Sequence, residues 1–375
     1  MSPSLYLGAT GFGLIAVCYG FARFAFGLFL PQIDADLSLS PTLSGLISGG
    51  SFLGYCIAIV LAAYLTERIG ARAVAVGAAL IAAVGMIGIA IASSTLWLAI
   101  AVMIAGSSTG LASPPMAAAV AATVRPDRQS ATNTIINAGT SAGVVLSGPV
   151  ALALGGQWRL AFAGFAVAAF VMAVAAAVSV PGENRAAPKT AGGLPPLNTV
   201  IVRLIAASFV MGASSTALWT FGGKLVNLQL GWSNTGAGLL WIAIGAAGIV
   251  GAGAGTLVAR FGIDRVHWFF LGTMALGILL VGTSATTPFL TLCGGILFGA
   301  SYIMLTGVYL VWGVSALPDR PATGLMIGFL TIAIGQTAGA PIFGLIMDQL
   351  TADYAVIVFA CLAFTAGLAR ASWPR

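Results

Sequence analysis

The sequence predicts an all-α membrane protein with twelve transmembrane helices in two pseudo-symmetric six-helix bundles. The first observation behind this prediction is that 59% of the 375 residues are hydrophobic, and the second is that only 6% are charged. Soluble proteins carry about 25% charged residues, and a charge at the centre of a bilayer costs at least about 2.5 kcal/mol. The third observation is an internal repeat, which divides the chain into two related halves.

Twelve segments are long and apolar enough to cross a bilayer, which takes about 20 residues per helix. They are found by cutting the chain at charged residues and at clusters of glycine and proline. The predicted helices are 5–30, 42–65, 71–93, 96–122, 130–154, 158–179, 200–223, 233–258, 266–284, 287–314, 322–347 and 353–370. The first segment is too long for the core of a signal peptide, so we expect it to be the first spanning helix.

The basic residues predict the orientation of these helices. With a cytoplasmic N-terminus, twelve lysines and arginines fall on the cytoplasmic side, and only Arg159 and Lys224 fall on the opposite side. Positive charges concentrate in short cytoplasmic loops. We therefore expect a multi-pass protein of a bacterial inner membrane with both termini in the cytoplasm. We interpret Lys224 as an interfacial lysine whose ammonium group reaches the membrane surface.

A shift of 192 residues aligns the two halves of the sequence with each other. The shift matches Leu65, Arg68, Gly70, Pro126-Asp127-Arg128, Gly143 and Pro149 to Leu257, Arg260, Gly262, Pro318-Asp319-Arg320, Gly335 and Pro341. We therefore expect an N-terminal half at 1–180, a cytoplasmic linker rich in proline and glycine at 181–199, and a C-terminal half at 200–375. An even number of helices in each half makes the repeat parallel, as in one class of transporters.

The loop between the second and third predicted helices carries a recognisable motif. Its sequence from residue 63 to 72 is AYLTERIGAR, and it is similar to the G-x-L-x-D-R-x-G-R-R loop of the major facilitator superfamily. Alanine replaces the first glycine of that motif, and Glu67 replaces the aspartate. The second copy, at 255–262, keeps the glycines but lacks the acid.

Other segments extend this resemblance over nearly the whole chain. Gly143-x4-Gly148-Pro149 is similar to the antiporter-associated motif of the superfamily, and Trp158-Arg159-x2-Phe162 also resembles its sequences. The segment 20–31 resembles the YbfB/YjiJ-like branch. The resemblance implies that helices 1, 4, 7 and 10 line a central cavity. The chain differs from many proton-coupled members because helix 4 has no arginine between Ala101 and Thr109.

The motif loops have two interpretations. The resemblance implies a latch, in which Glu67 meets arginines and a helix N-terminus of the other half and holds the cytoplasmic side shut. The residues assigned to it are Glu67, Arg68, Gly70, Arg72, Arg260 and Gly262. The alternative is a solvated loop whose positive charges only fix topology.

Arg23 is the most informative candidate for solute binding. It lies about ten residues before the end of the first predicted helix, and roughly 15 Å of helix is too far for its side chain to reach the membrane surface. One interpretation is a structural arginine that donates to carbonyl groups of a neighbouring helix. The other is a cavity-facing cation that binds an anionic group of the solute. All nine acidic residues fall at or near predicted helix ends, so no mid-membrane carboxylate is expected to neutralise Arg23.

Further candidates share helix faces or sit on the cavity helices that the resemblance implies. Tyr19 lies four residues before Arg23, and Tyr302, Thr306 and Tyr309 have the spacing of one helix face. The predicted solute-binding residues are Arg23, Tyr19, Trp219, Tyr302, Thr306, Tyr309 and Gln336. Asn133 and Asn137 share a face of helix 5, where bonding between helices and solute contact both remain open.

These observations favour a secondary transporter that moves a small solute, an organic anion, by alternating access, with a proton as the candidate coupling ion. Two alternatives stay open: an efflux antiporter for amphipathic drugs or metabolites, and a membrane sensor that transports nothing. We predict no enzyme, because nucleophile, metal and paired-acid motifs are missing. We expect no cofactor and no metal, a monomer in the lipid bilayer, and no nucleic-acid partner, because the basic residues form no patch.

Overall fold

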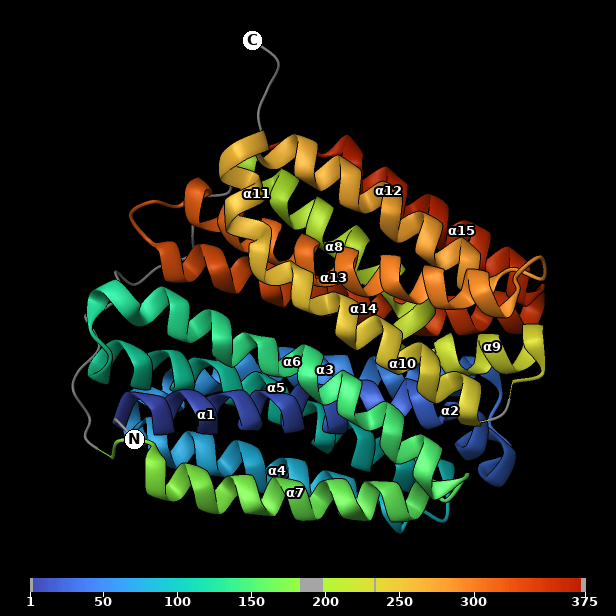
Figure 1. Ribbon diagram of the computed structural model, residues 1–375, viewed down its shortest axis with the longest axis horizontal. Coiled ribbons are helices and arrows are strands. Elements are labelled where there is room, and N and C mark those ends of the chain that lie inside the picture. The colour runs from blue at the N-terminus through green and yellow to red at the C-terminus, as the bar shows by residue number, and fades with distance from the viewer. Residues whose placement is uncertain (1–2, 183–197, 233, 372–375) are drawn as a thin grey trace.

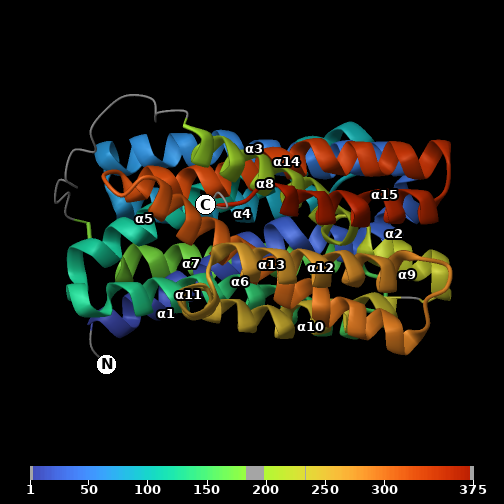
Figure 2. The ribbon, with the colours of Figure 1, turned by 90° about the horizontal axis from the view of Figure 1, so that it is seen from above.

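The computed structural model describes residues 3–182, 198–232 and 234–371. Within these ranges the chain forms helices and no strands. Most of the predicted linker, at 183–197, lies outside the described residues. Figure 1 shows the helices running along the long axis of the molecule, with those of the first half below and most of those of the second half above. Figure 2 gives the same bundle from above.

The first half begins with a long helix whose middle part is a π-helix. The elements of this half are α1 (Pro3–Ile15), η1 (Ala16–Phe24), α2 (Ala25–Leu37), α3 (Pro41–Ile69), α4 (Ala71–Ala90), α5 (Thr95–Thr123), α6 (Pro126–Leu154) and α7 (Trp158–Ser179). The first predicted helix was placed at 5–30, and the structure extends it to Leu37 through Pro31.

The second half contains two interrupted helices. Its elements are α8 (Thr199–Trp219), α9 (Gly222–Leu230), α10 (Asn234–Gly248), η2 (Ile249–Gly253), α11 (Ala254–Phe261), α12 (Ile263–Gly282), α13 (Pro288–Ala316), α14 (Pro321–Gln349), α15 (Ala352–Thr365) and η3 (Ala366–Leu368). A break at Thr220 and Phe221 separates α8 from α9, and a 3-10 turn joins α10 to α11.

Eleven helices of the described chain are long and apolar enough to cross a membrane. They correspond to the first eleven predicted segments. The last predicted segment, 353–370, is a shorter apolar helix over Ala352–Leu368, so the twelfth span is confirmed only in part. Side chains fix where several helices begin: Ser40, Ser94 and Thr287 each accept a hydrogen bond from the third backbone N–H that follows.

The internal repeat is visible in the backbone. The sequence shift of 192 residues carries α4 onto α12, whose bounds then coincide. Gly70 and Gly262, the matched glycines before these helices, have φ of 87° and 82° and ψ of 157° and 156°. That conformation is essentially restricted to glycine. The two motif loops therefore share one backbone turn.

We define two ends of the bundle. The basic end is the one where α3 meets α4 and α11 meets α12; Arg68, Arg72 and Arg260 lie there. The far end is the one where α2 meets α3 and α9 meets α10, on the right of Figure 1.

The two halves approach most closely toward the far end. A Cβ added to Gly27 would overlap the carbonyl oxygen of Trp219, and one added to Gly45 would overlap that of Ala340. Bare glycine surfaces let helix backbones pack this closely.

Candidate functional site

A cavity of about 530 Å3 lies between the two halves. Its walls come from α1, η1, α3, α5 and α6 of the first half and from α10, η2, α11, α13 and α14 of the second. Arg23 and Gln336 line its inner end. The remaining lining on α6 and α14 comes from the parts of these helices nearer the basic end, such as Asn133 and Leu325. The cavity therefore extends from Arg23 toward the basic end.

The π-helix η1 places Arg23 at this position. The N–H of Ala25 bonds to the carbonyl of Gly20, five residues earlier, instead of four as in an α-helix. The segment packs tightly on α6, because a Cβ on Gly20 would overlap the backbone of Gly143. π-helical turns are frequent at functional sites. Here the π turns carry both Tyr19 and Arg23 to the cavity wall.

Arg23 is a buried cation that forms no ion pair with any carboxylate of the described residues. Its side chain is 7% exposed, and Nη2 donates to Oε1 of Gln336 at 2.5 Å. Its guanidinium carbon lies 4.6 Å from the ring centre of Tyr55 and 4.7 Å from that of Phe52. The rings of Phe24 and Tyr19 follow at 5.2 Å and 5.8 Å. Among the described residues, Nε of Arg23 has no hydrogen-bond partner.

Gln336 joins this arginine to the second half. Its amide nitrogen donates to Oγ of Ser215 at 3.1 Å and to the hydroxyl of Tyr302 at 3.2 Å. These two bonds use the NH2 group, so the amide oxygen is turned toward Arg23, which can only donate. The Arg23–Gln336 bond therefore crosses directly between the halves, from η1 to α14.

The structure brings together five of the seven predicted solute-binding residues. Arg23, Tyr19, Tyr302, Thr306 and Gln336 all line the cavity. The hydroxyl of Tyr19 lies 3.1 Å from Oγ of Ser113. Oγ1 of Thr306 donates to the carbonyl of Tyr302 on its own helix at 2.9 Å.

The other two predicted residues do not line the cavity. Trp219 is buried behind Phe24, with ring centres 4.1 Å apart and the rings stacked. Tyr309 lies on another side of α13, where its hydroxyl donates to the carbonyl of Ala207 at 3.2 Å and lies 2.8 Å from Nε2 of His267. Tyr309 therefore belongs to the packing of the second half.

Lys224 is placed differently from its interpretation as an interfacial lysine. Its Nζ lies 2.5 Å from Oδ2 of Asp34, and the two side chains are only 15% and 12% exposed. Asp34 also accepts from Oγ of Ser44 at 2.9 Å. The ammonium group does not reach outward because a carboxylate of the other half binds it at the far end.

The latch residues contact only their own halves in the described chain. Glu67 is exposed and has no ion-pair partner there. Arg68 lies 4.4 Å from the ring centre of Tyr64, and Nε of Arg72 donates to the carbonyl of Val180 at 2.6 Å. Arg260 lies 5.2 Å from the ring centre of Phe261. The latch stays a prediction for another conformation.

The sequence reasoning missed Phe52, Tyr55 and Ser113. Phe52 and Tyr55 lie on α3, which was not among the expected cavity helices, yet their rings are the nearest to the Arg23 guanidinium. Aromatic residues are common in membrane helices, so no local signal distinguished this pair.

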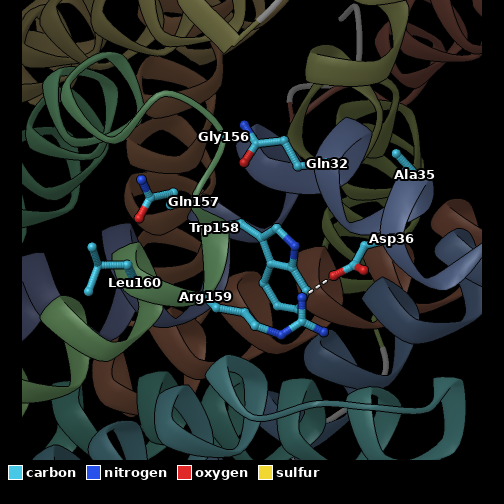
Figure 3. A pocket seen from close by; sticks show the side chains of 8 residues that line it. All are labelled: Gln32, Ala35, Asp36, Gly156, Gln157, Trp158, Arg159 and Leu160. Carbon is cyan, nitrogen blue, oxygen red and sulfur yellow. Dashed lines mark hydrogen bonds and ion pairs between the residues drawn. The ribbon is translucent and has the colours of Figure 1, made fainter.

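A second, shallow hollow lies at the far end within the first half (Figure 3). It is lined by Gln32, Ala35 and Asp36 of α2 and by residues 156–160 around the start of α7. Arg159 forms an ion pair with Asp36 and lies 4.1 Å from the ring centre of Trp158. The Trp158-Arg159 motif thus ties α7 to α2, and no predicted solute-binding residue lies here.

Comparisons with known proteins agree with this architecture. The family model described as Major Facilitator Superfamily matches residues 12–333. The structure is similar to that of the nucleoside transporter NupG, with a TM-score of 0.78, 13% identity and 98% of each chain covered. It is also similar to the xylose transporter XylE from E. coli in a partially occluded inward-open conformation, with a TM-score of 0.78, 15% identity and coverage of 98% and 97%.

A third similar structure is a bacterial homolog of the human lysosomal transporter Spinster, inward-facing and unoccupied, with a TM-score of 0.75, 15% identity and 98% of each chain covered. No curated protein matches the chain. At these identities the likeness extends to the fold alone.

Proposed function

The chain belongs to the major facilitator superfamily, and from that premise we propose that it moves a small organic anion across the membrane by alternating access. Arg23 is the anion-binding residue in this proposal. One observation carries it: a buried guanidinium lines the inner end of a cavity between the halves, and no carboxylate of the described chain forms an ion pair with it.

The electrostatics of this site favour an anion. A buried charge is costly unless it is paired. Four aromatic rings and one amide oxygen compensate the charge of Arg23 in part, since ring faces attract cations. A carboxylate would complete this compensation and would give Nε the acceptor that it lacks. A cationic solute would be repelled from the same place.

The arrangement of the halves supports alternating access. The cavity extends toward the basic end, while the far end is closed by backbone contacts and by the Asp34–Lys224 pair. An anion at Arg23 would compete with Oε1 of Gln336 for Nη2 of the guanidinium. Because that bond joins the halves, anion binding and relative movement of the halves would be coupled there.

The test is uptake into proteoliposomes of a panel of small carboxylates, with the neutral amide of each acid as its matched control. We expect uptake of at least one acid and not of its amide. Arg23→Ala should lower that uptake about tenfold to a hundredfold, which corresponds to losing a charged hydrogen bond. Arg23→Lys should restore it in part, because an ammonium keeps the charge but lacks the planar fork.

Arg125→Ala is the control, because Arg125 is an exposed arginine at the basic end and outside the cavity. Thermal unfolding of each variant separates lost binding from lost folding. A folded Arg23→Ala protein with wild-type uptake would refute an anionic substrate and favour a neutral amphipathic one. Absence of flux for every compound would favour a sensor.

A further inference from the structure

The cavity has a second polar feature, on the wall that α6 contributes. Asn133 and Asn137 are one helical turn apart on the same face, and both line the cavity. Neither side chain makes a hydrogen bond with any described residue. Asn137 is exposed, and Asn133 is half-buried. Bonding between helices, which the sequence left open for this pair, is therefore absent from the described chain. Two amide groups are free to meet a solute.

The lining that the second half contributes is largely apolar. Ile249, Ile303, Leu310 and Val311 lie on it, and Thr306 is among its few polar side chains. We therefore expect the hydrogen-bonding groups of a solute to contact side chains of the first half. The amides of Asn133 and Asn137 can donate and accept at once, which suits neutral amide or hydroxyl groups.

Within the part of the chain that the structure describes, Arg23 is the only charged residue that lines the cavity. A solute with one negative charge is neutralised there. A second negative charge would be held in the cavity without a partner, which is unfavourable in a poorly hydrated site. The solute's remaining polar groups are therefore expected to be neutral.

The packing of η1 on α6 gives the spacing of the two polar positions. Gly20 touches Gly143, six residues beyond Asn137, and Arg23 lies three residues beyond Gly20. At 1.5 Å per residue, about 13 Å of helix separates the level of Asn137 from that of Arg23. A solute has to span less than this distance, because the long side chain of Arg23 and the amide side chain of Asn137 cover part of it.

We propose that Asn133 and Asn137 form a second binding subsite, which holds a neutral hydrogen-bonding group of a monoanionic solute whose carboxylate binds Arg23. This subsite rests on the proposed function, since Arg23 must bind the anionic end. It adds two requirements on the substrate, one on its length and one on its charge. The substrate is an elongated monoacid with a neutral polar group at its other end.

Three related acids test the subsite: octanoate, suberate monoamide and suberate. They share a carboxylate and a straight chain, and they differ at the far end by a methyl, a neutral amide or a second carboxylate. Binding is measured by titration calorimetry on the full chain in nanodiscs, with empty nanodiscs as the blank. We expect the monoamide to bind about tenfold more tightly than octanoate, and suberate to bind most weakly.

The double variant Asn133→Leu/Asn137→Leu should remove the preference for the monoamide, so that the monoamide no longer binds more tightly than octanoate. Ile135→Ala is the matched control, because Ile135 lies on the same helix, 58% exposed and outside the cavity lining. It should keep the wild-type preference, and thermal unfolding checks that all variants fold.

The outcomes separate this inference from the proposed function. Equal binding of octanoate and the monoamide, lost in Arg23→Ala, would overturn the amide subsite and keep the anion site. An unchanged monoamide preference in the double variant would also overturn the subsite. No binding of any acid, or binding that does not depend on Arg23, would overturn both.

Discussion

The two ends of the helix bundle differ in how the halves meet. At the far end, Gly27 and Gly45 let backbones of opposite halves touch, and the pairs Asp34–Lys224 and Ser48–Thr220 cross the interface. At the basic end, the motif arginines contact their own halves, and the cavity extends between the halves toward this end.

This difference indicates which contacts would change if the two ends opened in turn. Among the described residues, the closed end combines rigid backbone contacts with the Asp34–Lys224 ion pair and with hydrogen bonds from Thr42 to the Asp348 carboxylate. A single charge change can cancel the ion pair or weaken the Thr42–Asp348 contact, but it cannot cancel the backbone contacts. At the open end, Glu67, Arg68 and Arg260 are exposed, lie close to helix ends and have no partner across the interface in the described chain. The far end therefore has contacts between the halves that must break before it opens. The basic end has exposed charges that can form new contacts between the halves when it closes.

The largest expected effect concerns which side of the membrane each end faces. Cysteines placed in the 181–199 linker should be fully protected from impermeant thiol reagents in intact cells if the basic end is cytoplasmic. A cysteine at Ser93, in the loop between α4 and α5 at the far end, should be labelled fully. The background should lack Cys18, Cys56, Cys293 and Cys361. Labelling of the linker in intact cells would reverse the orientation.

The next effect concerns the closed end. Asp34→Asn leaves Lys224 half-buried without its carboxylate, which should shift the balance toward opening of the far end by about 1–3 kcal/mol, or roughly 5- to 150-fold. Labelling of cysteines on the two sides reports this shift. The exchange Asp34→Lys/Lys224→Asp should restore the closed end. Equal labelling of Asp34→Asn and wild type would show that the pair does not hold the halves together.

The smallest expected effect concerns Glu67. If the latch forms in the outward-open conformation, Glu67→Gln should shift the ensemble toward the conformation that is open at the basic end. An exposed charge near a helix N-terminus contributes about 0.3–1 kcal/mol, so the shift should be a few-fold. Asp127→Asn is the control, because its partner Arg125 lies in the same loop. No change in labelling would leave the loop as a topology signal only.

The helices could be predicted from the sequence because a bilayer imposes a length and an apolar composition on each of them. The matched turns at Gly70 and Gly262 were also predictable, since the repeat placed glycines where the backbone needs them. Interruptions were not predictable: the π-helix η1 and the 3-10 turn η2 lie inside continuous apolar runs. Close contacts with other helices accompany them, such as Gly20 against Gly143 and Gly251 against Ile303.

The site was predictable where an unusual residue type stood out. Arg23 and Gln336 are polar groups in apolar helices, and such groups need a partner or a cavity. Tyr309 and Trp219 were misplaced because a helix in a bundle packs on several sides, and spacing alone does not tell which side faces the cavity. For Lys224, no local pattern indicated that the carboxylate of Asp34 lies beside it, because the two residues are far apart along the chain.

The π-helix has a consequence for how this chain should be aligned with its relatives. A π turn holds more residues than an α turn, so η1 behaves like a helix into which extra residues have been inserted. Deleting one residue between Tyr19 and Arg23 would keep a helix but rotate everything after the deletion by about 100°. The cavity-facing position of Arg23 is thus encoded by the number of residues before it. A relative without the extra residues can have an arginine aligned with Arg23 in sequence. Its helix would be rotated at that point, so a different residue would face the cavity there.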